Sequence, residues 1–499
     1  MRNRYMKKKL EINKIIDNKY FYPVLVTVLL VSSFFIRLAA LNQTEFGNGW
    51  DVYFYLEQLQ SLVHYGKFHS PDVSLIYPYF LLFYFLTGSF LLAVKAGSAL
   101  LSSFLVLSSF LLVKKLSGRS LIALMIASFL VFSPTLTFFT AQFPKNLMGL
   151  GFLIFFLYFF LNQKKIAALI FFILAFITHR STAGLSIVFL VLYFLSRPGI
   201  FRRYWMIFAS VSGIGIAVSF TLPGTIHIDD FLRFKEFFGG FQFPFFSFFE
   251  ALGKDQFSFL WTVEIILICF SFFFSLFLIL KQRRFFLLPL IFLLLLLIFP
   301  FFRFNLEGPA YRFFLIFLLV SPLLFFILLE RVQNFFLVFI SLIFIIFSFF
   351  SYSSYQPKLF DPPYEFYHKV IEKSRVFLKE KDFELLVAKK ALAEMTGFEM
   401  ERDAMAWKPD EGYRSERVYR FVSGVSYQEI FYYLGSVPEN EIYQIAPELL
   451  ILREDLWEKC IQKARILGEE GWEEKFFNKD NPYKRRPGYL LKNKEGKKK

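Results

Sequence analysis

The chain has 499 residues, of which 56% are hydrophobic and 21% aromatic, and its mean hydropathy is +0.49. A soluble protein of this composition would aggregate, so that class is excluded and membrane-spanning helices are indicated. The net charge of +16 comes with no nucleic-acid-binding motif, so we assign it to membrane topology and to contacts with anionic lipid headgroups or phosphates.

Apolar segments long enough to suggest membrane helices are spaced along residues 21–351, which we predict to form a transmembrane domain. They cover residues 21–41, 75–94, 97–113, 120–139, 147–162, 166–178, 182–196, 205–222, 259–280, 285–301, 312–329 and 335–351. The expected fold is therefore mostly α-helical and polytopic.

Basic residues in short loops predict the topology. The basic N-terminus (residues 1–20) and the loops that carry Lys114, Lys164 and Lys281 fall on one side only if the 75–94 segment does not fully cross. We therefore predict about eleven crossings plus one partial segment, in a plasma or inner membrane. The N-terminus is then cytoplasmic, and the C-terminal region lies outside.

The first predicted outer loop, residues 42–74, contains the most informative residue of the chain. Val52, Leu56, Leu59 and Val63 recur at helical spacing, which predicts an amphipathic helix lying on the membrane and ending near Gly66. Asp51 directly precedes this helix. A carboxylate at that position can cap the helix, act as a base at the membrane surface, or do both.

Several cations are predicted outside, where they could bind a lipid-linked phosphate: Lys145, His179, Arg180, Arg303 and Arg312. Each also has a purely structural interpretation, as a helix end, a polar turn or an interface anchor. A second predicted outer loop, residues 223–257, is rich in Phe and Gly and fits either a mobile flap over a lipid site or a membrane anchor.

Glu264 lies inside an apolar segment, where an ionisable residue either faces a cavity or pairs with a buried arginine. Arg37, near the outer end of the first span, is predicted to be an interface anchor. Further candidates for contacts or for proton transfer are Glu307, Tyr311, Tyr55 and His64.

The hydrophilic region 352–499 shows alternating helix and strand patterns, which predict a small soluble α/β or α+β domain outside the membrane. ELLVA and ELLILRED predict strands, and EDLWEKCIQKARIL predicts an amphipathic helix. The two cysteines, Cys269 and Cys460, lie in an apolar run and in the hydrophilic region, so no disulfide is expected between them. No Cys/His cluster has metal-ligand spacing.

The stretch GWDVYFYLEQLQSLVHYGKF, followed by LIYPYFLLFYFLTG, resembles the first outer loop of GT-C superfamily glycosyltransferases. In that family an acidic residue precedes an aromatic helix and a Tyr-Pro or Pro-Pro step, here Asp51 and Tyr77-Pro78. FLVFSPTLTFFTAQFPKNLMGLGFL, FITHRSTAG and LEGPAYRFF resemble later segments in the same order. The similarity is architectural and covers about residues 20–351.

The resemblance implies transfer of one sugar from a polyprenyl-phosphate donor to a lipid-linked, polysaccharide or protein acceptor on the outer face. Asp51 would be the general base of an inverting displacement, and no cofactor is implied. The loop AQFPKN lacks the paired acids of oligosaccharyltransferases, and GEEGWEEKFF is not their WWDYG signature. Transfer of a whole glycan to asparagine is therefore not expected, and a divalent metal is not favoured.

Other classes remain open. A transporter or flippase for a lipid-linked sugar would require polar residues at mid-membrane and inverted repeats. A non-enzymatic envelope assembly protein would keep its function without Asp51. A polysaccharide polymerase or ligase would use an arginine-rich outer loop, whereas the arginines here are scattered.

Overall fold

The computed structural model describes residues 20–196 apart from 71 and 73, residue 213, residues 259–298 and 309–354, and residues 362–468 apart from 382, 389, 403, 406–414 and 437–438. The chain divides into two compact units. The first, here the helical unit, comprises Met1–Thr44, Val73–Leu86 and Lys95–Phe360. The second, here the mixed unit, comprises Glu45–Asp72, Thr87–Val94 and Asp361–Lys499. Most of the predicted 42–74 loop thus belongs with the C-terminal region.

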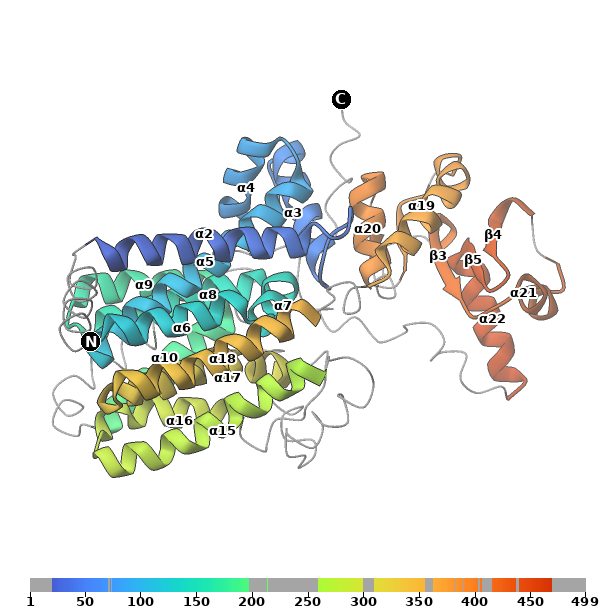
Figure 1. Ribbon diagram of the computed structural model, residues 1–499. Coiled ribbons are helices and arrows are strands. Elements are labelled where there is room, and N and C mark those ends of the chain that lie inside the picture. The colour runs from blue at the N-terminus through green and yellow to red at the C-terminus, as the bar shows by residue number, and fades with distance from the viewer. Residues whose placement is uncertain are drawn as a thin grey trace, which may run out of the picture. The chain divides into compact units, whose positions relative to one another are not determined.

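The helical unit is built from apolar helices that run alongside one another (Figure 1). Helices are expected here, because only a helix satisfies all of its own backbone polar groups in lipid. They are α2 (Phe21–Leu41), α4 (Ile76–Thr87), α5 (Phe90–Ser117), α6 (Ser120–Phe132), α7 (Pro134–Gln142), α8 (Pro144–Leu161), α9 (Lys165–Thr178), α10 (Arg180–Leu195), α15 (Phe259–Gln282), α16 (Leu288–Leu297), α17 (Pro309–Leu328) and α18 (Asn334–Ser354).

Within the described residues, five helices are long and apolar enough to cross a membrane. They include Phe21–Leu41, Phe90–Ser117 and Phe259–Gln282, and the pair α6 and α7 makes a sixth if the two helices form one span. The prediction of a multi-span membrane protein is confirmed. The number of about eleven crossings stays a prediction, because several further apolar helices are shorter and the 205–222 segment lies outside the description apart from Gly213.

The predicted 75–94 segment divides at Gly88, whose φ is +67°. Before this break, α4 has 12 residues, a length of about 18 Å, which is short of the ~30 Å hydrocarbon core. After it, α5 begins at Phe90 and continues for 28 residues. The helix boundary that we predicted between residues 94 and 97 therefore lies earlier, at Gly88.

The predicted single span 120–139 is also divided, at Ser133-Pro134. The helices on either side, α6 and α7, meet at an angle of 59°. Pro134 has no N–H to continue the helix, and the Ser133 hydroxyl accepts a hydrogen bond from Leu136 N at 3.3 Å, which caps α7. The sequence Ser-Pro thus ends one helix and starts the next.

The mixed unit combines helices with a sheet of mixed direction, as predicted for the C-terminal region. Its described strands follow the order β2-β1-β3-β5-β4; β1 is parallel to β2 and β3, and β5 is antiparallel to β3 and β4. The strands are β1 (Leu385–Val387), β2 (Ala404–Met405), β3 (Val418–Ser423), β4 (Ile442–Ala446) and β5 (Leu449–Arg453). The helices are α3 (Val52–Tyr65), α19 (Tyr364–Lys379), α20 (Lys390–Met400), α21 (Tyr427–Leu434) and α22 (Glu454–Ile466).

Helix α22 supplies much of the core around β3 and β5. Its apolar face carries Trp457 and Cys460, both fully buried in one cluster with Val422 and Leu450. This matches the predicted strands ELLVA and ELLILRED, which become β1 and β5, and the predicted helix EDLWEKCIQKARIL. Cys269 and Cys460 are both free thiols.

Helix α3 packs against α20 within the mixed unit. The ring of Tyr53 lies 4.6 Å from that of Tyr364 and 5.9 Å from that of Phe398, and the Tyr364 hydroxyl donates to Gly49 O at 2.7 Å. The predicted helix from Val52 and its predicted end near Gly66 are confirmed. The predicted placement on the membrane surface is wrong for the buried face of α3, which contacts protein. The 45–72 segment and the C-terminal region form one unit, and which side of the membrane holds it stays a prediction.

Candidate functional site

Asp51 occupies the N-cap position of α3, but its side chain accepts no capping hydrogen bond. Instead, Lys390 Nζ donates to Asp51 Oδ1 at 2.5 Å, and the Asp51 side chain keeps 20% of its surface exposed. The carboxylate is therefore fixed by an ion pair from α20 and remains accessible. Of the two roles that the sequence allowed for Asp51, the capping hydrogen bond is absent.

A second carboxyl group shares the same ammonium. Glu394, one turn further along α20, has Oε1 at 3.8 Å from Lys390 Nζ, and its side chain is only 12% exposed. Burial raises the pKa of Glu394 to about 8; the Lys390 charge lowers this pKa and the Asp51 charge raises it. Below about pH 8, Glu394 is mostly protonated, so the Lys390 charge mainly balances Asp51.

The face of α3 toward α20 carries further polar side chains. Glu57 is 1% exposed, its Oε2 lies 3.4 Å from Nε2 of the buried His69, and its other oxygen packs against Gly397 of α20. Tyr55 is buried at 5% exposure, so the structure places this predicted candidate inside the protein.

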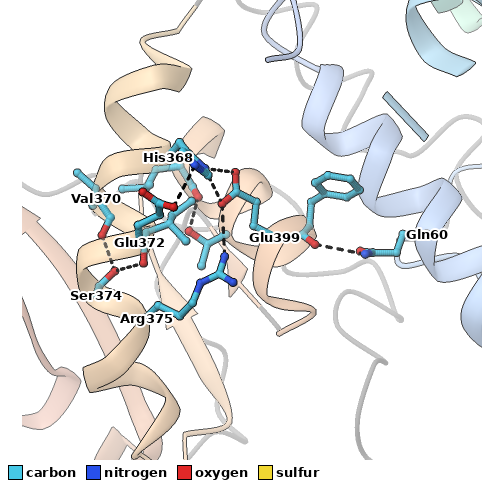
Figure 2. Close-up of polar contacts among 11 residues, drawn as sticks. Gln60, His368, Val370, Glu372, Ser374, Arg375 and Glu399 are labelled. Carbon is cyan, nitrogen blue, oxygen red and sulfur yellow. Dashed lines mark hydrogen bonds and ion pairs between the residues drawn. The ribbon is translucent and has the colours of Figure 1, made fainter. Parts of the chain in front are cut away.

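The C-terminal end of α20 is tied to its neighbours by a polar network. Figure 2 shows His368 and Arg375 of α19 pointing toward Glu399; His368 Nδ1 lies 2.9 Å from Glu399 Oε1 and Arg375 Nη2 lies 3.9 Å from Glu399 Oε2. In the same network, Gln60 of α3 donates to Phe398 O at 3.3 Å. His64 is nearby in this network, with Nδ1 3.7 Å from Glu401 Oε1.

In the helical unit, Arg37 and Glu264 meet the broken helix at Ser133. Arg37 is fully buried and donates to Leu130 O at 2.7 Å, to Ser133 O at 3.2 Å and to Val131 O. The Ser133 hydroxyl lies 3.2 Å from Glu264 Oε1 and donates to it. The prediction of Arg37 as an interface anchor is wrong. Pro134 provides no N–H for Leu130 O, which accepts hydrogen bonds from Arg37 and from Ser133 N instead.

Two of the predicted phosphate-binding cations gather at the start of α8. Lys145 lies in the first turn of α8. Phe143 is the N-cap residue of α8, and the Arg312 guanidinium stacks 4.7 Å from the centroid of its ring. His179 is the N-cap of α10, where its Nδ1 accepts a hydrogen bond from Ser181 N at 3.2 Å. This agrees with the polar-turn interpretation of His179.

The other predicted positions are not described in side-chain detail. Arg180 and Tyr311 are placed only by their backbone, in the first turns of α10 and α17. Arg303, Glu307, the 223–257 loop and residues 1–19 lie outside the described residues.

Sequence reasoning missed Lys390 and Glu394. Their spacing of four residues is visible, but it is common on helices and does not point to a residue 339 positions earlier in the chain. In the part of the chain that the structure describes, no group of three or more His, Cys, Asp or Glu side chains could hold a metal ion.

The class of protein follows from the helices: this is a multi-span helical membrane protein with five to six candidate spans among the described residues. No known protein family matches the chain, and no curated protein is detectably related to it.

Proposed function

We propose that the protein is a membrane glycosyltransferase that transfers one sugar from a polyprenyl-phosphate donor to an acceptor hydroxyl, with Asp51 as the general base. The observation that carries the proposal is the state of Asp51. Its carboxylate is released from helix capping, held by Lys390 at 2.5 Å and partly exposed at the start of α3. A positioned, accessible carboxylate is what a general base requires.

In the proposed step, the acceptor oxygen attacks the anomeric carbon while its proton passes to Asp51. The bond from that carbon to the phosphate oxygen breaks, and the lipid phosphate leaves with the electron pair. Direct displacement inverts the anomeric centre. The ammonium of Lys390 lies 2.5 Å from Asp51 Oδ1 and holds the carboxylate in place to accept the proton.

The leaving phosphate needs positive charge where its own negative charge develops. Within the helical unit, we propose Arg312 and Lys145 for this role, because they lie at the start of α8, where the helix dipole adds to their positive charge. The acceptor class stays a proposal: a lipid-linked glycan, an envelope polysaccharide or a protein hydroxyl on the outer face.

The test uses purified full-length protein in lipid nanodiscs with a panel of radiolabelled polyprenyl-phosphate sugars and membrane extract as acceptor source. Wild type and Glu365→Gln should transfer label from one donor, because Glu365 is 70% exposed and lies on α19, where it pairs with Lys369. Asp51→Asn should bind that donor without transferring. Transfer by none of the three, with donor bound, would contradict the proposal.

A transporter of a lipid-linked sugar is the second candidate, and one observation favours it. Arg37, Ser133 and Glu264 form a buried charged group at a broken helix in the membrane region, a feature typical of transporter sites. This candidate predicts that the wild type moves a fluorescent polyprenyl-phosphate lipid between leaflets of a proteoliposome and that Glu264→Gln stops this movement. Equal lipid movement in empty liposomes would dismiss it.

A further inference from the structure

Lys390 lies between two carboxyl groups that belong to different segments of the mixed unit. We propose that Lys390 and Glu394 are positioning residues for Asp51, and that Glu394 sets, by gaining or losing its proton, how firmly Lys390 holds the Asp51 carboxylate. The inference rests on the proposed function of Asp51 as the base. It gives the C-terminal region a part in the reaction.

The geometry around the ammonium is asymmetric. Lys390 Nζ is 2.5 Å from Asp51 Oδ1 but 3.8 Å from Glu394 Oε1. Glu394 Oε2 is buried and has no hydrogen-bond partner among the described residues. An ionised carboxylate with one uncompensated oxygen is costly in such a place. The neutral form of Glu394 is therefore favoured, and Lys390 stays closer to Asp51.

The charged groups on the elements around α20 pair elsewhere. Helix α20 packs against α3, α19 and β2. Near α3, Glu57 pairs with His69, and His64 faces Glu401. On α19, His368 and Arg375 contact Glu399, His368 also contacts Glu372, and Glu365 pairs with Lys369. Before β2, Arg402 stacks on Phe383. The charges that shift the pKa of Glu394 are those of Lys390 and Asp51.

Two states follow from this arrangement. With Glu394 protonated, Asp51 is the ionised one of the two carboxyl groups beside the ammonium, and Lys390 holds it firmly. When Glu394 releases its proton to solvent, with a pKa of about 8, two carboxylates share the ammonium. Lys390 then holds Asp51 less firmly, and the Asp51 carboxylate is freer to accept the acceptor's proton. The transfer rate should therefore rise as Glu394 ionises.

The test measures kcat and KM for transfer between about pH 6 and about pH 9.5, in wild type, Glu394→Gln, Lys390→Met and Lys390→Arg. Wild-type kcat should rise about fivefold through pH 8, the size of a partly exposed ion-pair effect, with KM unchanged. Glu394→Gln and Lys390→Met should show no such rise, and Lys390→Arg should restore it.

A matched pair of controls is available on α19. Glu365 and Lys369 form an exposed pair with the same spacing of four residues. Glu365→Gln and Lys369→Met should both keep the wild-type pH profile. A Glu394→Gln profile that still rises like the wild type, or a rise lost equally in the control variants, would overturn the inference.

A second measurement does not depend on activity. The pH dependence of thermal unfolding of the full chain reports the ionisation of Glu394, and Asp51→Asn should move this ionisation to lower pH because a neighbouring negative charge is gone. If Asp51→Asn transfers like the wild type, the proposed function fails, but the unfolding measurement still tests the coupling between Asp51 and Glu394. A shift of the Glu394 ionisation to lower pH supports this coupling, and an unchanged ionisation overturns it. If Asp51→Asn is inactive but Glu394→Gln behaves like the wild type in both measurements, only the inference fails.

Discussion

One charged group in each unit, Arg37 with Glu264 and Asp51 with Lys390, is held in an opposite way. In the helical unit, Arg37 is fully buried and bonded to three backbone carbonyls, and Glu264 is bonded to Ser133. In the mixed unit, Asp51 and Lys390 bond to each other and keep 20% and 50% of their side-chain surface exposed. A buried charged side chain that hydrogen-bonds to backbone carbonyls stabilises the fold. A charged side chain that is held by another side chain and stays partly exposed can take part in chemistry.

Removing the buried cation should have the largest effect on stability. Arg37→Met removes the charged donor of Leu130 O, Val131 O and Ser133 O, and each lost hydrogen bond to a charged group costs about 1.5–3 kcal/mol. Thermal unfolding in detergent should show a loss of more than about 3 kcal/mol or no folded protein at all. The exposed control Lys115→Met should change stability by less than about 0.5 kcal/mol. Equal stability of the two variants would contradict the claim that buried Arg37 stabilises the fold.

Gly397 tests how closely α3 and α20 pack in the mixed unit. A Cβ at this position would lie 2.1 Å from Glu57 Oε1, so Gly397→Ala must displace a buried carboxylate. We expect a loss of about 1–3 kcal/mol in unfolding free energy. The control is Gly184→Ala in α10, where a Cβ would meet nothing within 4 Å. That variant should be neutral or gain up to about 1 kcal/mol; a loss of the same size in both variants would argue against close packing.

The protonation of Glu394 predicts a pH-dependent stability. Its pKa is raised from 4.5 to about 8, so the folded state holds a proton that the unfolded chain has lost. The stabilisation is complete below the unfolded pKa and is lost as pH rises through about 8. Glu394→Gln should flatten the curve and be more stable than wild type above pH 8 by on the order of 1–2 kcal/mol. Parallel curves for the two proteins would show that Glu394 does not titrate in this range.

The smallest expected effect is at His179, whose ring caps α10. His179→Ala should cost about 1 kcal/mol, and His179→Asn should recover most of this because Asn is a good N-cap residue. Unfolding of the two variants measures the difference. A large loss of transfer in both, without a change in stability, would instead assign His179 to the donor phosphate.

Local patterns predicted much of the fold. The spacing of Val52, Leu56 and Leu59 gave the helix that became α3, and the EDLWEKCIQKARIL segment gave α22. The predicted span 120–139 runs across the bend at Ser133-Pro134, because the apolar run continues through it and hydropathy does not record a missing N–H. The prediction of Arg37 as an interface anchor was wrong for a similar reason, because the backbone carbonyls to which Arg37 donates face it only where the helix is broken.

The contacts of the candidate site were predictable only in part. Asp51 could be singled out because a carboxylate beside an aromatic helix is locally visible in the sequence. Its partners could not, because Lys390 and Glu394 reach it through a contact between segments 339 residues apart, which leaves no local pattern. The pairing itself, and the burial that raises the pKa of Glu394, exist only in the folded mixed unit.

The central claim is that Asp51 is the base for sugar transfer, and the most direct test is single-turnover transfer by Asp51→Asn with donor binding measured in the same sample. Binding should be retained, and the rate should fall by about a hundredfold or more, as expected for loss of a general base. A wild-type rate with intact binding would contradict the account.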